Sequence, residues 1–222
     1  MRLLEYIEDM QHIRTWDDIK KVFGGHVEEY PGVNKNPQSG QSGRVWKIKG
    51  KELALKITTE PEEIALTKKL VGKNNTGFIN IYKAVEVPPH KHNGRKVPRL
   101  MLKVQEFCYP IPELKKHRFS SFLPYLMQHV MENYDTDIKD KDYRSMEDFK
   151  EMYNEFKNSE HLPLRTFSQK VEAQKEFTPI LINFIDMMKR VKSDADIEFY
   201  ELDVHGDNIM QTKEGDWKLV DF

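Results

Sequence analysis

The sequence predicts an α+β fold, because strand-like and helix-like hydrophobic patterns occupy different parts of the chain. Between residues 44 and 107, short apolar runs separated by Gly, Pro and Asn are typical of antiparallel strands. Between residues 178 and 192, apolar residues recur at helical spacing. Near the end, 209–212 and 217–220 predict a strand pair around a turn at 214–216.

Composition sets broad limits on the function. The chain has 222 residues, enough for one sizeable core or two lobes. Charged residues make up 32% and the formal net charge is −1, which argues against a broad electrostatic nucleic-acid binder. A single cysteine, Cys108, excludes an internal disulfide framework and fits a reducing compartment. No signal peptide or membrane-spanning run is evident, so we expect a soluble cytoplasmic protein without a membrane partner.

The first 25 residues predict two short helices. Apolar residues from Leu3 to Met10 recur at helical spacing. Thr15 followed by Asp18 has the pattern of a capping box for a second helix that ends at Gly24. Phe23 in this helix is interpreted as a packing residue. We expect this extension to brace the segment that follows.

Residues 38–45, Gln38-Ser39-Gly40-Gln41-Ser42-Gly43-Arg44-Val45, place glycines and small polar residues directly before a strand. Glycine lets the backbone turn tightly and bring its N–H groups close to phosphate oxygens. Two interpretations stay open: a phosphate-covering loop made by Gly40, Gln41, Ser42 and Gly43 and flanked by Val45, or a flexible linker.

A tight hairpin is predicted next, with strands at 44–49 and 52–57 joined through Gly50-Lys51. Its second strand contains Ala54-Leu55-Lys56. A lysine in an apolar strand needs a counter-charge if its head group turns inward; the alternative is a lysine that faces solvent. The candidate partner is Glu63, in a helix that starts at Pro61, with Glu62 as the neighbouring alternative.

Two further strands are predicted at 78–87 and 99–107, joined by a polar loop at 88–98. The loop contains His90 and His92, but no further residue nearby has the spacing of a metal ligand, so solvated histidines are expected there.

Between residues 109 and 178 the sequence predicts a helix over 120–133 and a second one with an apolar stripe from Met146 to Phe156. The stripe is interpreted as packing. A strong helix is predicted over 178–192, and five apolar residues line one of its faces: Leu181, Phe184, Ile185, Met188 and Val191.

The last 20 residues contain acidic and amide groups at suggestive positions. Asp203 is followed five residues later by Asn208, and Asp221 ends the second predicted strand. The hairpin would bring Asp221 back beside Asn208. Phosphoryl transfer needs one Asp facing the nucleophile and separate oxygen ligands for Mg²⁺. The alternative is a surface hairpin with ordinary acidic residues.

Taken in order, these segments resemble the protein-kinase-like superfamily. The glycine loop is followed by Ala54-Leu55-Lys56, which matches the Val-Ala-Ile-Lys signature of the third kinase strand, and by a helix that carries Glu63. Asp203 to Asn208 matches the catalytic loop, and Asp221-Phe222 matches the metal-binding motif. The wording of Asp203 to Met210 is similar to that of bacteriophage-encoded protein kinases, which would place the protein in the host cytoplasm.

The resemblance implies a bilobal fold. Residues 26–108 would form an N-terminal lobe, a five-stranded antiparallel sheet with one main helix, preceded by the helical extension 1–25. Residues 109–222 would form a mostly helical C-terminal lobe that stops after the metal-binding Asp. Because the chain ends at Phe222, before an activation segment, we expect either a fragment or a minimal kinase-like protein in which 110–178 replaces the lost support.

The resemblance also implies that the cofactors are ATP and Mg²⁺. Asp203 would orient the attacking hydroxyl of a protein or small-molecule substrate. Asn208 and Asp221 would hold Mg²⁺. Lys56 would contact the α- and β-phosphates of the nucleotide, and Glu63 would position Lys56.

The remaining nucleotide contacts follow from the same resemblance. The loop Gly40 to Gly43 would cover the phosphates, with Val45 and Ala54 on the adjoining strands. Gln105 would occupy the gatekeeper position, and Glu106 to Cys108 would form the hinge whose backbone binds adenine.

Several residues depart from the kinase pattern. Glu201 stands where His is usual, and Leu202 where Arg is usual, so a phosphorylated activation loop would have no partner. His205-Gly206-Asp207 resembles small-molecule phosphotransferases, but in that register Thr212 replaces the Asn, which favours Asp203. The leading hypothesis is a Ser/Thr protein kinase-like enzyme. The alternatives are a pseudokinase-type module that docks a protein partner and a small-molecule kinase.

Overall fold

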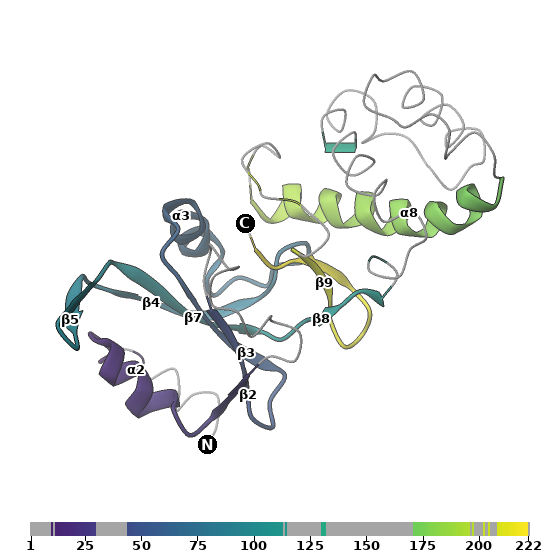
Figure 1. Cartoon of the computed structure of the whole chain (residues 1–222). Coiled ribbons are helices and arrows are strands. Elements are labelled where there is room, and N and C mark those ends of the chain that lie inside the picture. Colours follow the sequence, from purple (N-terminus) through teal and green to yellow (C-terminus); the bar gives the residue numbers. More distant parts are fainter. Residues whose placement is uncertain are drawn as a thin grey trace. The chain divides into compact units, whose positions relative to one another are not determined.

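The computed structural model describes residues 10, 12–29, 44–112, 114, 130–131, 171–195, 197, 202, 204 and 208–221. The chain divides into two compact units (Figure 1), residues 1–75 with 79–108 and residues 76–78 with 109–222. Both helices and antiparallel sheets are present, so the predicted α+β class is confirmed. In the described part of the chain, no helix is long and apolar enough to cross a bilayer.

The first unit is built on one antiparallel sheet with the strand order β1-β2-β3-β7-β4. Its strands are β1 Val27–Glu29, β2 Arg44–Ile48, β3 Leu53–Thr58, β4 Ile81–Val87 and β7 Leu100–Glu106. The last four were predicted within a few residues. β1 was not predicted, because three residues are too few for a periodic pattern to be recognised.

The structure corrects the prediction that residues 88–98 form only a polar loop. It contains two short strands, β5 His90–His92 and β6 Arg95–Val97, which pair antiparallel. They turn through Asn93 and Gly94, with φ angles of 49° and 75°. Two successive positive φ angles are what a tight hairpin turn requires, and Asn-Gly is the dipeptide that favours it. The structural signal therefore lay in Asn93-Gly94 rather than in hydrophobic alternation.

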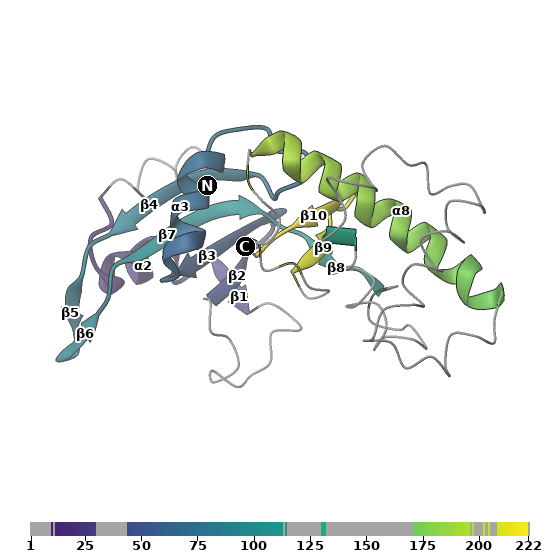
Figure 2. The same cartoon turned by 90° about the horizontal axis from the view of Figure 1, so that it is seen from above.

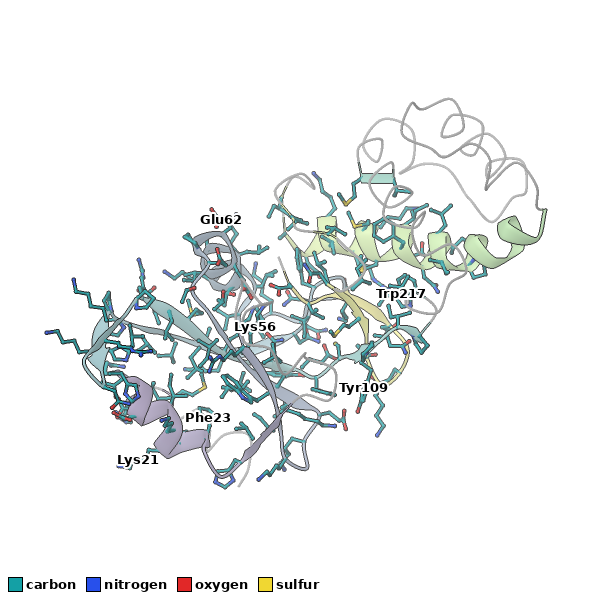
Figure 3. All side chains as sticks on the ribbon, viewed as in Figure 1. Lys21, Phe23, Lys56, Glu62, Tyr109 and Trp217 are labelled. Atoms are coloured by element: carbon teal, nitrogen blue, oxygen red, sulfur yellow. The ribbon has the colours of Figure 1, made fainter. Side chains whose placement is uncertain are left out.

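One face of the main sheet is covered by α2, Trp16–Phe23. The predicted capping box is present: the Thr15 hydroxyl accepts a hydrogen bond from the Asp18 N–H, and the Asp18 carboxylate accepts one from the Thr15 N–H. Phe23 is buried between α2 and the sheet (Figure 3) and packs in one cluster with Leu55 and Ile57 of β3. Within the described residues, α2 therefore braces the sheet, as predicted.

The opposite face of the sheet carries α3, Pro61–Leu70. Side chains alternate between the two faces of a strand. Leu55 and Ile57 contribute to the α2 side, so Ala54, Lys56 and Thr58 of β3 belong to the α3 side. Five residues of α3 are buried: Glu63, Ile64, Leu66, Thr67 and Leu70.

The second unit contains α8, Val171–Asp194, and a small antiparallel sheet of order β10-β9-β8. Its strands are β8 Tyr109–Pro110, β9 Ile209–Gln211 and β10 Trp217–Leu219, and β10 lies beside α8 (Figure 2). The five predicted apolar residues of α8 are all buried. The helix begins earlier than predicted, because it continues through Pro179, which the sequence pattern placed in the first turn.

The C-terminal end of α8 binds the segment 76–78. The Asp194 carboxylate accepts hydrogen bonds from the backbone N–H groups of Thr76, Gly77 and Phe78 at 2.6 to 2.9 Å. A Cβ atom on Gly77 would overlap the backbone nitrogen of Val191, so only glycine fits this contact. The helix predicted at residues 3–10, most of that at 120–133 and the stripe 146–156 lie outside the described residues.

Candidate functional site

Lys56 and Glu63 form a buried ion pair in the first unit. The Lys56 Nζ lies 2.6 Å from Glu63 Oε1, and their side chains are 2% and 1% exposed. Lys56 comes from the α3 side of β3, and Glu63 from the first turn of α3, whose buried face rests on that side. Of the two partners left open by the sequence, Glu63 is therefore the one that pairs with Lys56, and Glu62 is exposed on α3 (Figure 3).

A second lysine binds the same carboxylate oxygen. Lys103 of β7 is directly opposite Lys56 in the strand register, and its Nζ donates to Glu63 Oε1 at 2.6 Å. The side chain of Lys103 is fully buried. The sequence reasoning missed this residue, although its signal matched that of Lys56: a lysine between two apolar residues, Leu102 and Val104, in a buried strand.

The electrostatics of the cluster favour an ionised carboxylate. Burial of Glu63, the largest single influence, raises its pKa, but Coulombic attraction and hydrogen bonds from Lys103 and Lys56 together outweigh it and lower the pKa. Glu63 Oε2 has no hydrogen-bond partner among the described residues, and neither has Thr67 Oγ1 one helical turn later. The α3 side of the sheet is therefore polar at its centre.

Other residues predicted to bind the nucleotide lie on the same face of the sheet. Val45 is directly opposite Lys56 in the register, and Ala54 is directly opposite Gln105. Directly opposite residues in antiparallel strands point to the same side. The structure thus brings together Val45, Ala54, Lys56 and Gln105 with Lys103.

The predicted hinge residues follow β7. The Glu106 carboxylate accepts a hydrogen bond from the Asn80 side-chain amide at 3.1 Å. The N–H groups of Glu106 and Phe107 donate to the carbonyls of Asn80 and Glu52. The hinge is therefore anchored by its neighbours at these two positions, and Cys108 is buried.

The hairpin of the second unit brings the backbone of Asn208 opposite Val220, the residue before Asp221. Leu219 pairs with Ile209 in the register, and the N–H of Val220 donates to the carbonyl of Asn208 at 2.9 Å. Asp221 therefore follows directly on the residue bonded to Asn208. The turn at Gly215 has a φ of 98°, which glycine adopts without strain. The predicted hairpin is confirmed.

These two side chains fit a Mg²⁺ ion only in part. Mg²⁺ is commonly held by one or two protein oxygens together with phosphate oxygens of the substrate. Within the described residues, no group of three His, Cys, Asp or Glu side chains could hold a metal by itself. Asn208 and Asp221 would thus hold Mg²⁺ together with ligand phosphates.

The remaining predicted site residues are outside the described part of the chain. They are Gly40, Gln41, Ser42, Gly43 and Asp203. Leu202, which takes the place of the usual kinase Arg, is buried.

Comparison with known proteins finds no relative: no family model, no curated protein and no solved structure matches this chain.

Proposed function

We propose that this protein is an ATP- and Mg²⁺-dependent phosphotransferase of the protein-kinase-like type, acting on a hydroxyl group such as that of Ser or Thr. The observation that carries the proposal is the buried ion pair between Lys56 of β3 and Glu63 of α3. A buried ion pair is often no more stabilising than well-packed apolar residues of similar volume. A functional reason for charge at this place is therefore favoured over a purely structural one.

The first unit supplies the groups for the nucleotide. Lys56 binds phosphate oxygens and Glu63 holds Lys56 in position. Val45 and Ala54 offer apolar contact on the same face of the sheet, and Gln105 stands beside them. The backbone from Glu106 to Cys108 binds the adenine edge through groups other than the N–H of Glu106 and of Phe107, which donate to Asn80 and Glu52.

The kinase-like resemblance assigns Asn208 and Asp221 to the metal and Asp203 to the acceptor. Asn208 and Asp221 would hold Mg²⁺, which would neutralise phosphate charge when bound. Asp203 orients the acceptor hydroxyl and takes its proton as the oxygen attacks the γ-phosphorus. The new O–P bond replaces the bond between that phosphorus and the bridging oxygen of the leaving ADP.

Phosphoryl transfer from radiolabelled ATP tests this proposal on panels of protein and small-molecule hydroxyl acceptors. We expect transfer by the wild type and losses of at least about 100-fold in Lys56→Met, Asp203→Ala and Asp221→Ala, because each removes an electrostatic or positioning group. Lys69→Met, which removes an exposed lysine of α3, is the matched control and should retain activity.

Two outcomes would contradict the proposal. Equal activity in all variants would mean that the transfer does not use these residues. No transfer to any acceptor, with no Mg²⁺-ATP-induced rise in melting temperature, would leave a binding module without nucleotide chemistry. Transfer confined to small molecules would instead correct the acceptor class.

A further inference from the structure

Two lysines, not one, share Glu63. Both nitrogen atoms lie 2.6 Å from Glu63 Oε1, so they can be no farther apart than twice that distance. Ammonium groups this close repel each other strongly in a buried setting unless an ionised carboxylate lies between them. A one-to-one pair has a single lysine, whereas here two buried lysines bind one carboxylate oxygen.

Two buried lysines beside one carboxylate suit an anionic ligand. Ammonium groups form strong hydrogen bonds with ionised oxygens, and a multiply charged phosphate chain offers several of them. The unpartnered Oε2 of Glu63 and Oγ1 of Thr67 show that polar bonding capacity remains on this face of α3. The layer between β3, β7 and α3 is thus suited to a charged ligand as well as to a packed core.

The second lysine also changes what the first one can do. In a one-to-one pair, moving the lysine onto a ligand would leave the buried carboxylate without a counter-charge, which is strongly unfavourable. Here Lys103 also donates to Glu63 Oε1, so Glu63 keeps a counter-charge when Lys56 directs hydrogen bonds to another anion. Sharing Lys56 with a ligand therefore costs less than it would in a simple pair.

We infer that Lys103 is a positioning residue that keeps Glu63 paired while Lys56 binds a polyphosphate anion. The inference deepens the proposed function, on which it rests for the identity of the anion as the phosphate chain of ATP. Lys103 acts through Glu63 and is not itself a phosphate ligand.

The first test measures whether the lysines replace each other, and it needs no ligand. Lys56→Met and Lys103→Met each leave a one-to-one pair, so each should melt within about 4 °C of the wild type. The double variant leaves Glu63 alone and should melt about 10 °C lower or more. A control double variant, Lys56→Met with Lys69→Met, should melt like Lys56→Met. The inference would be overturned if the double variant's fall in melting temperature equalled the sum of the falls in Lys56→Met and Lys103→Met.

The second test measures binding of inorganic tripolyphosphate by titration calorimetry, at a temperature at which circular dichroism shows every variant to be folded. Lys103→Met should weaken binding about tenfold in the wild-type background, because Lys56 must then serve both anions. In a Glu63→Gln background the same substitution should change Kd less than about threefold, since no carboxylate remains to be held.

The outcomes separate three cases. A tenfold loss that persists with Glu63→Gln would show Lys103 to be a direct phosphate ligand, and an unchanged Kd in Lys103→Met would show it to be structural; either overturns the inference. The predicted pattern with tripolyphosphate, but no phosphoryl transfer from ATP, would support the inference and contradict the proposed function. Phosphoryl transfer from ATP, together with a tripolyphosphate Kd that Lys103→Met leaves unchanged, would support the proposed function and contradict the inference.

Discussion

Two carboxylates of the first unit each bind two cations, but in different surroundings. Glu63 is buried and binds Lys56 and Lys103 through one oxygen. Glu86 of β4 is 32% exposed and divides its oxygens, Oε2 binding Lys68 of α3 at 2.8 Å and Oε1 binding Arg99. The number of charges is the same, and only the environment and the geometry differ.

The difference separates a structural cluster from a candidate site. Around Glu86 both cations are more than half exposed, water screens the charges, and each oxygen is used once. Around Glu63 there is little screening, one oxygen is used twice, and the other has no partner among the described residues. The surface cluster ties α3 to β4, whereas the buried cluster ties α3 to β3 and β7.

The largest effect is expected on the free energy of unfolding when the two carboxylates are neutralised one at a time. Glu63→Gln leaves two ammonium groups in the core and should lower the free energy of unfolding by about 3–5 kcal/mol. Glu86→Gln, the matched surface variant, should lower it by no more than about 1 kcal/mol. Urea unfolding of both variants measures the contrast. Equal losses would show that burial does not distinguish the clusters.

Acid should remove the contribution of the surface cluster over a defined range of pH. Hydrogen bonds from Arg99 and then Lys68 lower the pKa of Glu86 from 4.5 to about 2. A depressed pKa in the folded state means stability that is present above pH 4.5 and is lost as the pH falls toward 2. The difference in melting temperature between wild type and Glu86→Gln should therefore shrink over this range. A constant difference would contradict the ion-pair account of Glu86.

Salt should distinguish the two clusters further. Raising NaCl from 0.05 to about 1 M shortens the screening length to about 3 Å, so the stability difference between wild type and Glu86→Gln should largely disappear. The difference for Glu63→Gln should persist, because buried pairs are screened much less. Melting curves at both salt concentrations measure this. If the stability difference between wild type and Glu63→Gln also fell with added salt, water would have to reach the cluster.

The smallest effect is expected from the outermost cation. Arg99 is more than half exposed, and Glu86 keeps Lys68 when Arg99 is removed. Arg99→Met should therefore shift the melting temperature by at most about 2 °C. A larger fall would mean that Arg99 contributes more than a surface ion pair.

Local signals in the sequence were sufficient for much of the fold. The capping box of Thr15 and Asp18, the turn at Gly50 and the helical spacing in α8 each depend on residues close together in the chain, and each was predicted correctly. The start of α8 was wrong because Pro179 is compatible with two positions, the first turn or a tolerated break further along.

The candidate site was predictable only where a motif fixed the spacing. The pairing of Lys56 with Glu63 was predicted from their place in the kinase-like order and is confirmed. The hairpin that precedes Asp221 is also confirmed, while the metal role of Asn208 and Asp221 stays a prediction. Lys103 has the same local pattern as Lys56, but its pairing with Glu63 was missed because nothing local says that β7 lies beside β3 in this register. That pairing joins residues far apart in the chain and depends on the packing of the whole sheet.

The most direct test of the account is calorimetric binding of Mg²⁺-ATP to the wild type, Lys56→Met and Lys69→Met. If the buried lysine serves a nucleotide, Lys56→Met should weaken binding at least about tenfold while Lys69→Met binds like the wild type. Equal affinity of all three proteins for Mg²⁺-ATP would contradict the account, because the buried charge would then have no part in holding the nucleotide.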